Sequence, residues 1–380
     1  MSITDSDLKS LSSEVKKQFT TAITESDAFF YPSQKVTLQE SSKTGILWQI
    51  RTVPALLKKP KANDSTPPKE EAKQEGEAEQ NRQDVFAPPY VPNLHVKDLG
   101  QDHVVLLNKF CVVPQHFLMV TREFASQDLP PAPETLALAY RIVAAHKGGS
   151  MGTELLAFYN CGVTSGASQP HRHLQFVQCP PLDTTTEEAE ESGRLTKEEQ
   201  EKITECEYKV PVEALLDRIE RDGKEQDSVH ALPLPWQHFV VLLQPPAAAK
   251  KEEADMERYI GNKFMGLLDA LFRARMFAPE GEKKEGRPSF NILITKRAMH
   301  LIPRSKEEFE GLPGKEGSGG KVGNLSINSL AYAGFMLTRS IKEQEALKGV
   351  QGGVEEVLRC TGVGPVEDVT LMEGLPTTNM

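Results

Sequence analysis

Several features that define whole classes of protein are scarce in this 380-residue chain. Its five cysteines are odd in number and scattered through apolar surroundings, which excludes a regular disulfide framework and favours reduced thiols in the cytosol. No apolar run is long enough to cross a bilayer, and the polar start of the chain lacks the basic and apolar regions of a secretory signal. We therefore expect a cytoplasmic protein with no membrane partner, and its presence in the nucleus stays open.

Positive charge is scarce as well. The chain has 44 Lys and Arg against 54 Asp and Glu, which gives a net charge of -10 and a pI of about 5.5. Because general nucleic-acid binding needs a basic surface, we exclude nucleic acid as a partner. The 38% hydrophobic content and the mean hydropathy of -0.41 are those of a globular protein, and the length favours two packed units.

Changes in composition divide the chain. Residues 58–84 are almost all Lys, Glu, Gln, Pro and small polar types, which bury too little apolar surface to offset the entropy of ordering, so we predict a disordered insertion. An acidic, Thr-rich stretch ends at residue 205. We place an N-terminal half at 1–205, a C-terminal half at 206–348, and a C-terminal tail at 349–380.

Apolar periodicity predicts the elements of each half. The predicted helices span 6–25, 134–146, 254–276 and 326–347. The predicted strands and hairpins span 46–53, 102–121 with a turn at Asn108-Lys109, 155–160, 236–243 and 289–304. Residues 312–323 are glycine-rich and predict a mobile loop. Because strands, a long helix and a hairpin recur in both halves, we expect an α+β fold with mainly antiparallel sheets flanked by helices, built as two related halves.

The segment Gly166-Ala-Ser-Gln-Pro-His-Arg-His-Leu-Gln-Phe-Val-Gln178 carries the chemistry. In an extended conformation His171, His173 and Gln175 share one face. A neutral imidazole is nucleophilic near pH 7, and a neighbouring turn of backbone N–H groups could hold a phosphate against it. The pattern therefore predicts nucleotidyl transfer through a phosphohistidine.

Two simpler interpretations compete with this one. The histidines could bind zinc, but no CxxC or second histidine pair completes a tetrahedral site beside the nearby Cys179. They could also be a structural pair on a strand, although each buried imidazole would then need a hydrogen-bond partner. We favour the nucleophile.

The motif His171-Arg-His173-Leu-Gln175 resembles the active-site motif of the histidine-triad superfamily, in the branch with Gln at the last position. Residues 40–345 resemble the fungal diadenosine tetraphosphate phosphorylases, also called ATP adenylyltransferases, through Asn108-Lys109-Phe110, Asn160, Gly166-Ala-Ser, Asn291-Ile-Leu and Met299-His-Leu-Ile-Pro-Arg304. The resemblance implies a HIT-like fold with two related halves around one active-site cleft, in which the N-terminal half is catalytic and the C-terminal half completes the nucleotide site. It also implies the reversible phosphorolysis of diadenosine tetraphosphate by inorganic phosphate to ATP and ADP, through a nucleotidyl-histidine.

The resemblance also implies a role for each matched residue. His173 would attack the α-phosphorus, His171 would orient His173, and Gln175 would donate to the bridging or leaving oxygen. The implied substrate-binding residues are Lys58, Asn108, Lys109, Asn160, Gly166, Ala167, Ser168, Gln169, Asn291, Ile292, Leu293 and Met299. Lys59 stays an alternative to Lys58, because the insertion begins there. By residue type alone, the asparagines are typical of turns and the apolar three of a core.

The expected partners are dinucleoside polyphosphates, ATP, ADP and inorganic phosphate, and the expected oligomeric state is a monomer. We expect a divalent cation, Mg²⁺, to accompany the polyphosphate and neutralise its charge, and we expect no tightly bound protein metal. Three alternatives stay open: a HIT-type dinucleoside polyphosphate hydrolase, a sugar-phosphate uridylyltransferase with the same nucleophile, and a non-catalytic nucleotide-binding protein.

Overall fold

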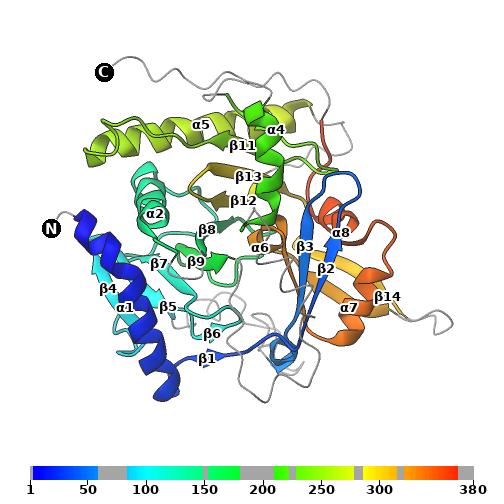
Figure 1. The fold of residues 1–380 in the computed structure, drawn as a ribbon, viewed down its shortest axis with the longest axis horizontal. Helices are drawn as coiled ribbons and strands as arrows, with labels where there is room; N and C mark the ends of the chain where they lie inside the picture. The colour runs from blue at the N-terminus through cyan, green and yellow to red at the C-terminus, as the bar shows by residue number, and fades with distance from the viewer. Residues whose placement is uncertain are drawn as a thin grey trace, which may run out of the picture.

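The computed structural model in Figure 1 has the predicted α+β architecture, with a mainly antiparallel central sheet and helices around it. It describes residues 3–58, 84–148, 153–179, 209–221, 228–277, 286–314 and 321–366. Nearly all of the predicted insertion, the acidic stretch before residue 205 and the end of the predicted tail lie outside the described residues.

A nine-stranded sheet runs through both halves of the described chain in the order β10-β11-β13-β12-β8-β9-β7-β5-β4. Every neighbouring pair in it is antiparallel. Its strands are β4 His95–Leu99, β5 His103–Leu107, β7 Phe117–Thr121, β8 Glu154–Cys161, β9 His173–Cys179, β10 His230–Ala231, β11 Phe239–Leu242, β12 Ser289–Ile294 and β13 Ala298–Arg304. The two halves meet where β8 pairs with β12, so they share one sheet.

Three helices cover one face of this sheet: α1 Asp5–Thr24, α2 Pro133–Ala145 and α5 Glu253–Phe277. They confirm the predicted helices at 6–25, 134–146 and 254–276. Their apolar sides pack on alternate strand residues such as Leu174 and Phe176. The helical spacing of the apolar residues therefore determines both where these helices form and which side of each helix packs on the sheet.

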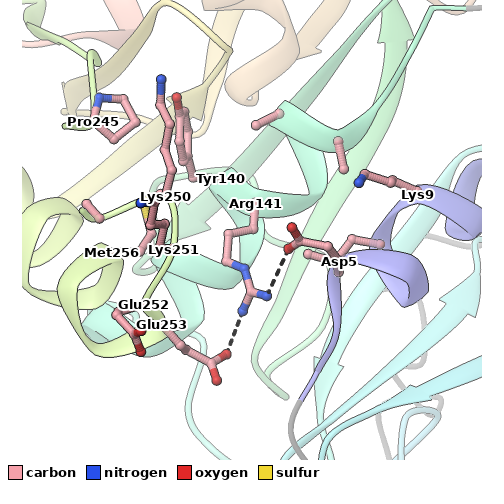
Figure 2. A pocket seen from close by; sticks show the side chains of 14 residues that line it. Asp5, Lys9, Tyr140, Arg141, Pro245, Lys250, Lys251, Glu252, Glu253 and Met256 are labelled. Carbon is pink, nitrogen blue, oxygen red and sulfur yellow. Dashed lines mark hydrogen bonds and ion pairs between the residues drawn. The ribbon is translucent and has the colours of Figure 1, made fainter. Parts of the chain in front are cut away.

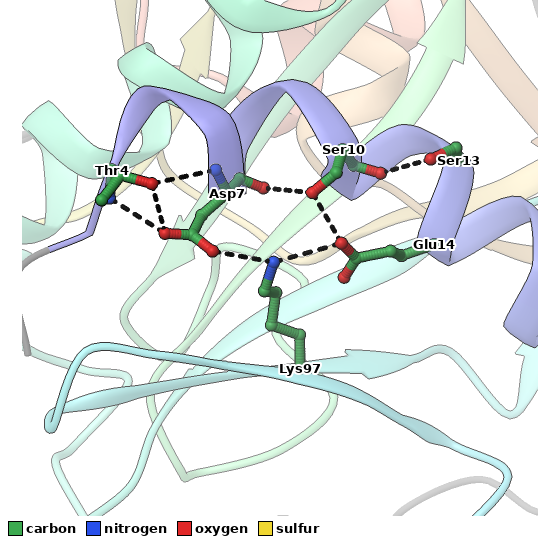
Figure 3. Close-up of polar contacts among 6 residues, drawn as sticks. All are labelled: Thr4, Asp7, Ser10, Ser13, Glu14 and Lys97. Atoms are coloured by element: carbon green, nitrogen blue, oxygen red, sulfur yellow. Dashed lines mark hydrogen bonds and ion pairs between the residues drawn. The ribbon is translucent and has the colours of Figure 1, made fainter.

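Helix α1 begins at a capping box, and its first turns are tied to the sheet (Figure 3). The Thr4 hydroxyl accepts from the Asp7 N–H, and the Asp7 carboxylate accepts from the Thr4 N–H, which satisfies donors that a helix start otherwise leaves unpaired. Lys97 of β4 places its Nζ 3.2 Å from Asp7 and 3.1 Å from Glu14. Hydrogen bonding to Thr4 holds the pKa of Asp7 near 2, so this carboxylate is charged at neutral pH.

The opposite face packs on a second layer formed by both ends of the chain. Strand β3 pairs in parallel with β16 and antiparallel with β2. The other small pairings are β1 with β6, and β14 with β15. These elements are β1 Phe29–Phe30, β2 Lys35–Glu40, β3 Leu47–Thr52, η1 Pro54–Lys58, β6 Phe110–Cys111, η4 Pro211–Leu215, α4 Leu216–Arg221, β14 Glu308–Pro313, β15 Lys321–Ser326, α6 Ser329–Ala333, β16 Phe335–Thr338, α7 Ile341–Lys348 and α8 Gly353–Thr361.

The hairpin over 289–304 is confirmed, and the one over 102–121 pairs β5 with β7 as predicted. Its connection is longer than Asn108-Lys109, because residues 108–116 separate the strands and include β6. The predicted strands at 46–53, 155–160 and 236–243 correspond to β3, β8 and β11.

Two predictions near the C-terminus are wrong, and a third is wrong at its ends. The helix expected at 326–347 is broken by Gly334, which has a φ of 121°, and the chain then forms β16. The loop expected at 312–323 begins and ends in the strands β14 and β15, and residues 315–320 lie outside the described residues. The tail expected at 349–380 contains α8, whose Val354 and Leu358 are fully buried. In each case packing against a distant segment supplied the stability that local pattern did not indicate.

Candidate active site

The histidine motif lies where β9 begins, on the face opposite the three covering helices. His173 is the first residue of β9 and pairs in register with Val120 of β7. Leu174 and Phe176 point into the helix-covered core, so His173 and Gln175 point to the other face. This confirms the predicted alternation.

His173 is set up as a neutral nucleophile. Its Nδ1 lies 2.8 Å from the carbonyl oxygen of His171. Because a carbonyl only accepts, Nδ1 carries the proton and Nε2 carries the lone pair. Burial, with a smaller contribution from nearby His171, lowers the pKa of His173 to about 4 although the hydrogen bond to the His171 carbonyl opposes this. Within the described residues Nε2 has no hydrogen-bond partner, so its lone pair is available at neutral pH.

His171 has both ring nitrogens engaged. Its Nδ1 lies 2.7 Å from Oδ2 of Asp84, and its Nε2 lies 2.7 Å from the carbonyl oxygen of Thr121. A carboxylate and a carbonyl both accept, so the ring satisfies both contacts by donating from each nitrogen. His171 therefore has no lone pair for attack, which fits the predicted orienting role.

The zinc interpretation finds no donor set. Among the residues that the structure describes, no group of three or more His, Cys, Asp or Glu is placed to hold a metal ion. Cys179 lies at the other end of β9, six residues and about 20 Å from His173. The nitrogens of His171 are occupied by Asp84 and Thr121 instead.

Gln175 lies two residues beyond His173 on the same face and is half-buried. Its strand neighbours are Leu118 of β7 and Phe158 of β8. Its side-chain amide makes no hydrogen bond within the described chain. It can therefore donate to an oxygen placed beside the His173 ring.

The loop from Gly166 to Gln169 joins β8 to β9. Gly166 has a φ of 83°, and a Cβ there would meet the Ile327 carbonyl oxygen at 2.6 Å, so glycine is required for this close approach. This loop of small residues, with Ser168 exposed, gives an anion such as a phosphate close access to backbone N–H groups.

Asn160 and Asn291 hold this loop in place. The Asn160 Oδ1 accepts from Asn291 Nδ2 at 2.8 Å and from the Ser329 hydroxyl at 2.6 Å. Asn291 Nδ2 also donates to the carbonyl oxygen of Ser165 at 2.9 Å, and Arg304 donates to the Asn291 Oδ1 at 2.7 Å. Both amides are buried and occupied, so they fix the position of the residue before Gly166.

Three apolar residues of the implied substrate-binding set, Ile292, Leu293 and Met299, are core residues. Ile292 and Met299 lie in the helix-side core with no exposure, on the opposite face from His173. Leu293 shares the face of His173 but is also fully buried. Strand alternation separates neighbours in sequence, so these side chains do not line a nucleotide pocket beside His173.

Asn108 and Lys109 lie at the far end of the same strands. From the strand register we place them about 17 Å from His173. Asn108 Nδ2 lies 2.9 Å from Nδ1 of His116, and the Lys109 Nζ lies 5.8 Å from the centre of the Phe110 ring. Lys58 closes η1, and its side chain lies, like Lys59, outside the described structure.

Gln127 is a site residue that the sequence did not reveal. Its Oε1 accepts from the His173 N–H at 2.8 Å, and its Nε2 donates to the Asn160 carbonyl oxygen at 2.7 Å. The pairing of β8 with β9 ends two positions before Asn160 and His173, at Phe158 and Gln175. The buried Gln127 side chain thus bridges Asn160 and His173 in place of a backbone pair and separates the strands at the nucleophile.

Two aromatic rings flank the histidines. The Phe86 ring lies 5.1 Å from the His173 ring, and the Phe124 ring lies 5.4 Å from the His171 ring. Phe86 also packs over an apolar patch of β5 and β7 that includes Val120. Phe86 follows the low-complexity segment and Phe124 lies in a loop, so no periodic pattern could have placed them here.

A separate pocket of about 220 Å³ opens on the helix side (Figure 2). Arg141 lies in it, with its guanidinium 2.6 Å from Glu253 and 3.7 Å from Asp5. Residues of α1, α2 and the start of α5 line this pocket, which places it across the sheet from His173. It is not the site of the histidine chemistry.

Among the described helices, none is both long and apolar enough to span a membrane.

Two protein-family models together match most of this chain. A family model described as the Ap4A phosphorylase N-terminal domain matches residues 3–191. A second, described as the ATP adenylyltransferase C-terminal domain, matches residues 232–364.

Two proteins of Saccharomyces cerevisiae are similar in sequence. Diadenosine 5',5'''-P1,P4-tetraphosphate phosphorylase 2 is 28% identical over 329 residues, covering 83% of this chain and 84% of the relative. Protein APA1 is 26% identical over 308 residues, covering 80% of each chain. The crystal structure of yeast Ap4A phosphorylase Apa2 has the same fold, with a TM-score of 0.64 at 23% identity over 93% of this chain and 94% of that one. A structure of Apa2 in complex with Ap4A aligns with a TM-score of 0.63 at 22% identity, over 93% of this chain and 97% of that one.

Proposed function

This chain belongs to the Ap4A phosphorylase family, and we propose that it phosphorolyses diadenosine tetraphosphate with inorganic phosphate, through His173, to give ATP and ADP. The reverse reaction would form the dinucleotide from the same pair. The observation that carries the assignment of the nucleophile is the geometry of His173, whose proton is held on Nδ1 and whose Nε2 is free. The small-residue loop at Gly166 leads into β9, the strand that carries His173.

The chemistry proceeds in two displacements. In the first, the Nε2 lone pair forms a bond to the α-phosphorus, the bond to the bridging oxygen breaks, and ATP leaves. In the second, an oxygen of inorganic phosphate bonds to the same phosphorus, the N–P bond breaks, and ADP leaves while His173 becomes neutral again. Each step is in line and depends on positioning and on stabilisation of charge.

The surrounding residues supply that stabilisation. The His173 ring becomes positive when Nε2 is bonded to phosphorus, and the Nδ1–H bond to the His171 carbonyl then becomes charge-assisted and stronger. Gln175 donates to the leaving oxygen without protonating it, which suits a good polyphosphate leaving group and a reversible transfer. The amides from Gly166 to Gln169 hold phosphate oxygens.

In the described part of the chain, no cluster of protein ligands is placed to bind a divalent cation. We propose that Mg²⁺ arrives bound to the polyphosphate, where it neutralises phosphate charge. We also propose a monomer that acts in the cytoplasm. The thiols of Cys161, Cys179 and Cys360 support a reducing compartment.

The acceptor is tested by product analysis. Diadenosine tetraphosphate is incubated with and without inorganic phosphate, and the expected products are ATP and ADP only when phosphate is present. A hydrolase would release AMP and ATP in both reactions, and a uridylyltransferase would need a sugar phosphate.

The nucleophile is tested by trapping. After incubation with substrate labelled at the α-phosphate, we expect an acid-labile, alkali-stable label on His173. The variant His173→Ala should lose turnover by about a thousandfold or more while it retains much of the substrate affinity. His95→Ala, on the edge strand β4 with its side chain 33% exposed, is the control and should stay within about threefold of the wild-type rate. Label on another residue would contradict the assignment.

A further inference from the structure

Both carboxylate oxygens of Asp84 make polar contacts beside the histidine pair, His171 and His173. Its Oδ1 accepts from the Phe86 N–H at 3.0 Å, and its Oδ2 lies 2.7 Å from Nδ1 of His171. The Asp84 side chain is 29% exposed, whereas that of His171 is 1% exposed. The carboxylate therefore lies at the rim of the site with its orientation fixed by its own backbone neighbour.

The contact with Asp84 completes the anchoring of His171. The other ring nitrogen is held by the Thr121 carbonyl at 2.7 Å, and the backbone of His171 forms a bridge with Ser126. The His171 carbonyl belongs to the peptide group whose Arg172 N–H donates to the Ala125 carbonyl at 2.7 Å, so this backbone bond and the two ring contacts together limit how far the carbonyl can turn. That carbonyl is the acceptor for the Nδ1–H of His173.

The tautomer of His173 depends on this acceptor. If the His171 carbonyl turned away, the His173 proton could move to Nε2, and the nitrogen that faces the substrate would lose its lone pair. The other oxygen of Asp84 holds the backbone of Phe86, whose ring lies 5.1 Å from His173 and 6.2 Å from His171. The Phe86 ring adds to the burial of His173 and so favours the neutral form of that ring.

We propose that Asp84 is a positioning residue for the transfer: its carboxylate fixes His171 and Phe86, and through the His171 carbonyl it holds the proton of His173 on Nδ1. This inference rests on the proposed function, because it assumes that His173 attacks through Nε2. Asp84 itself touches neither substrate nor reacting atoms.

The test compares Asp84→Ala, Asp84→Asn and the control Asp102→Ala, which removes an exposed carboxylate that makes no hydrogen bond in the described structure. We expect Asp84→Ala to lower kcat about 10- to 100-fold and to leave KM within about threefold of wild type. The size of the effect on kcat is taken from metalloenzymes, in which the loss of a carboxylate that orients a histidine has this magnitude. Asp84→Asn should recover most of the loss, since its Oδ1 can accept from Phe86 and its Nδ2 can donate to a neutral His171 ring. Asp102→Ala should match wild type.

A second measurement needs no turnover. Histidine-selective ¹⁵N NMR should report the Nδ1–H tautomer for His173 in the wild type and in Asp84→Asn, and a mixture of tautomers in Asp84→Ala. The inference is overturned if kcat of Asp84→Ala stays within about twofold of wild type, if Asn fails to rescue, or if the tautomer is unchanged. Should the wild type form no ATP and ADP, the proposed function fails, while the NMR comparison still decides the role of Asp84.

Discussion

Removing the polar end of Gln127 should destabilise the protein and slow it together. The side chain is 2% exposed and joins the His173 N–H to the Asn160 carbonyl across the point where β8 and β9 separate. Gln127→Met keeps the length and volume of the side chain but removes both polar atoms. It leaves a buried N–H without its acceptor and a buried carbonyl without a donor.

The magnitude follows from those two groups. An orphaned buried N–H costs about 1–3 kcal/mol, and the lost bond to the carbonyl about 0.5–1.5 kcal/mol, so we expect a loss of about 2–4 kcal/mol. That is a large share of the roughly 5–15 kcal/mol by which folded domains are stable. Because the N–H belongs to His173, the start of β9 should shift, and kcat should fall more than about tenfold.

Urea unfolding at equilibrium measures the first effect as a lower midpoint with an unchanged slope, and steady-state kinetics measure the second. Gln101→Met is the matched control, since Gln101 is exposed and its side chain makes no hydrogen bond in the described structure, so its unfolding free energy should stay within about 0.5 kcal/mol of wild type. The reasoning is refuted if Gln127→Met is as stable as this control and turns over within about twofold of wild type.

Two further predictions concern His173 and Gly166. Since burial lowers the pKa of His173 from 6.5 to about 4, about 97% of it should be neutral at pH 5.5, against about 9% of an ordinary histidine, so single-turnover labelling should persist there roughly tenfold better. An acid limb centred near pH 6.5 would contradict the burial. The unfolded chain binds this proton between pH 6.5 and 4 when the folded chain does not, so stability should fall as pH drops through that window, measured by urea unfolding across pH. Gly166→Ala should raise KM and lower the unfolding midpoint, because its Cβ would meet the Ile327 oxygen at 2.6 Å. Gly45→Ala is the control, because Gly45 also has a positive φ but a Cβ there would meet no atom within 4 Å. Equal effects of the two variants would rule out the packing explanation.

The parts of the fold with strong local periodicity were predictable. The helix at 254–276 shows an apolar stripe, and the hairpin at 289–304 joins two largely apolar runs around polar residues, so each needs only its own residues to be recognised. The segment 326–347 misled because its helix-forming residues include Phe335–Thr338, which become a strand by pairing with β3, almost 300 positions earlier in the chain. Local propensity is weak beside such pairing.

The chain order by itself determined that His171, His173 and Gln175 share a face and that a small-residue loop precedes them, because strand alternation and glycine geometry are local properties. Only the tertiary structure decided which atoms make the nucleophile usable. It brought Asp84 to His171 and Gln127 to His173 across 87 and 46 positions of sequence. It also buried the His173 ring enough to keep it neutral, because desolvation depends on everything packed around a group and not on its neighbours along the chain.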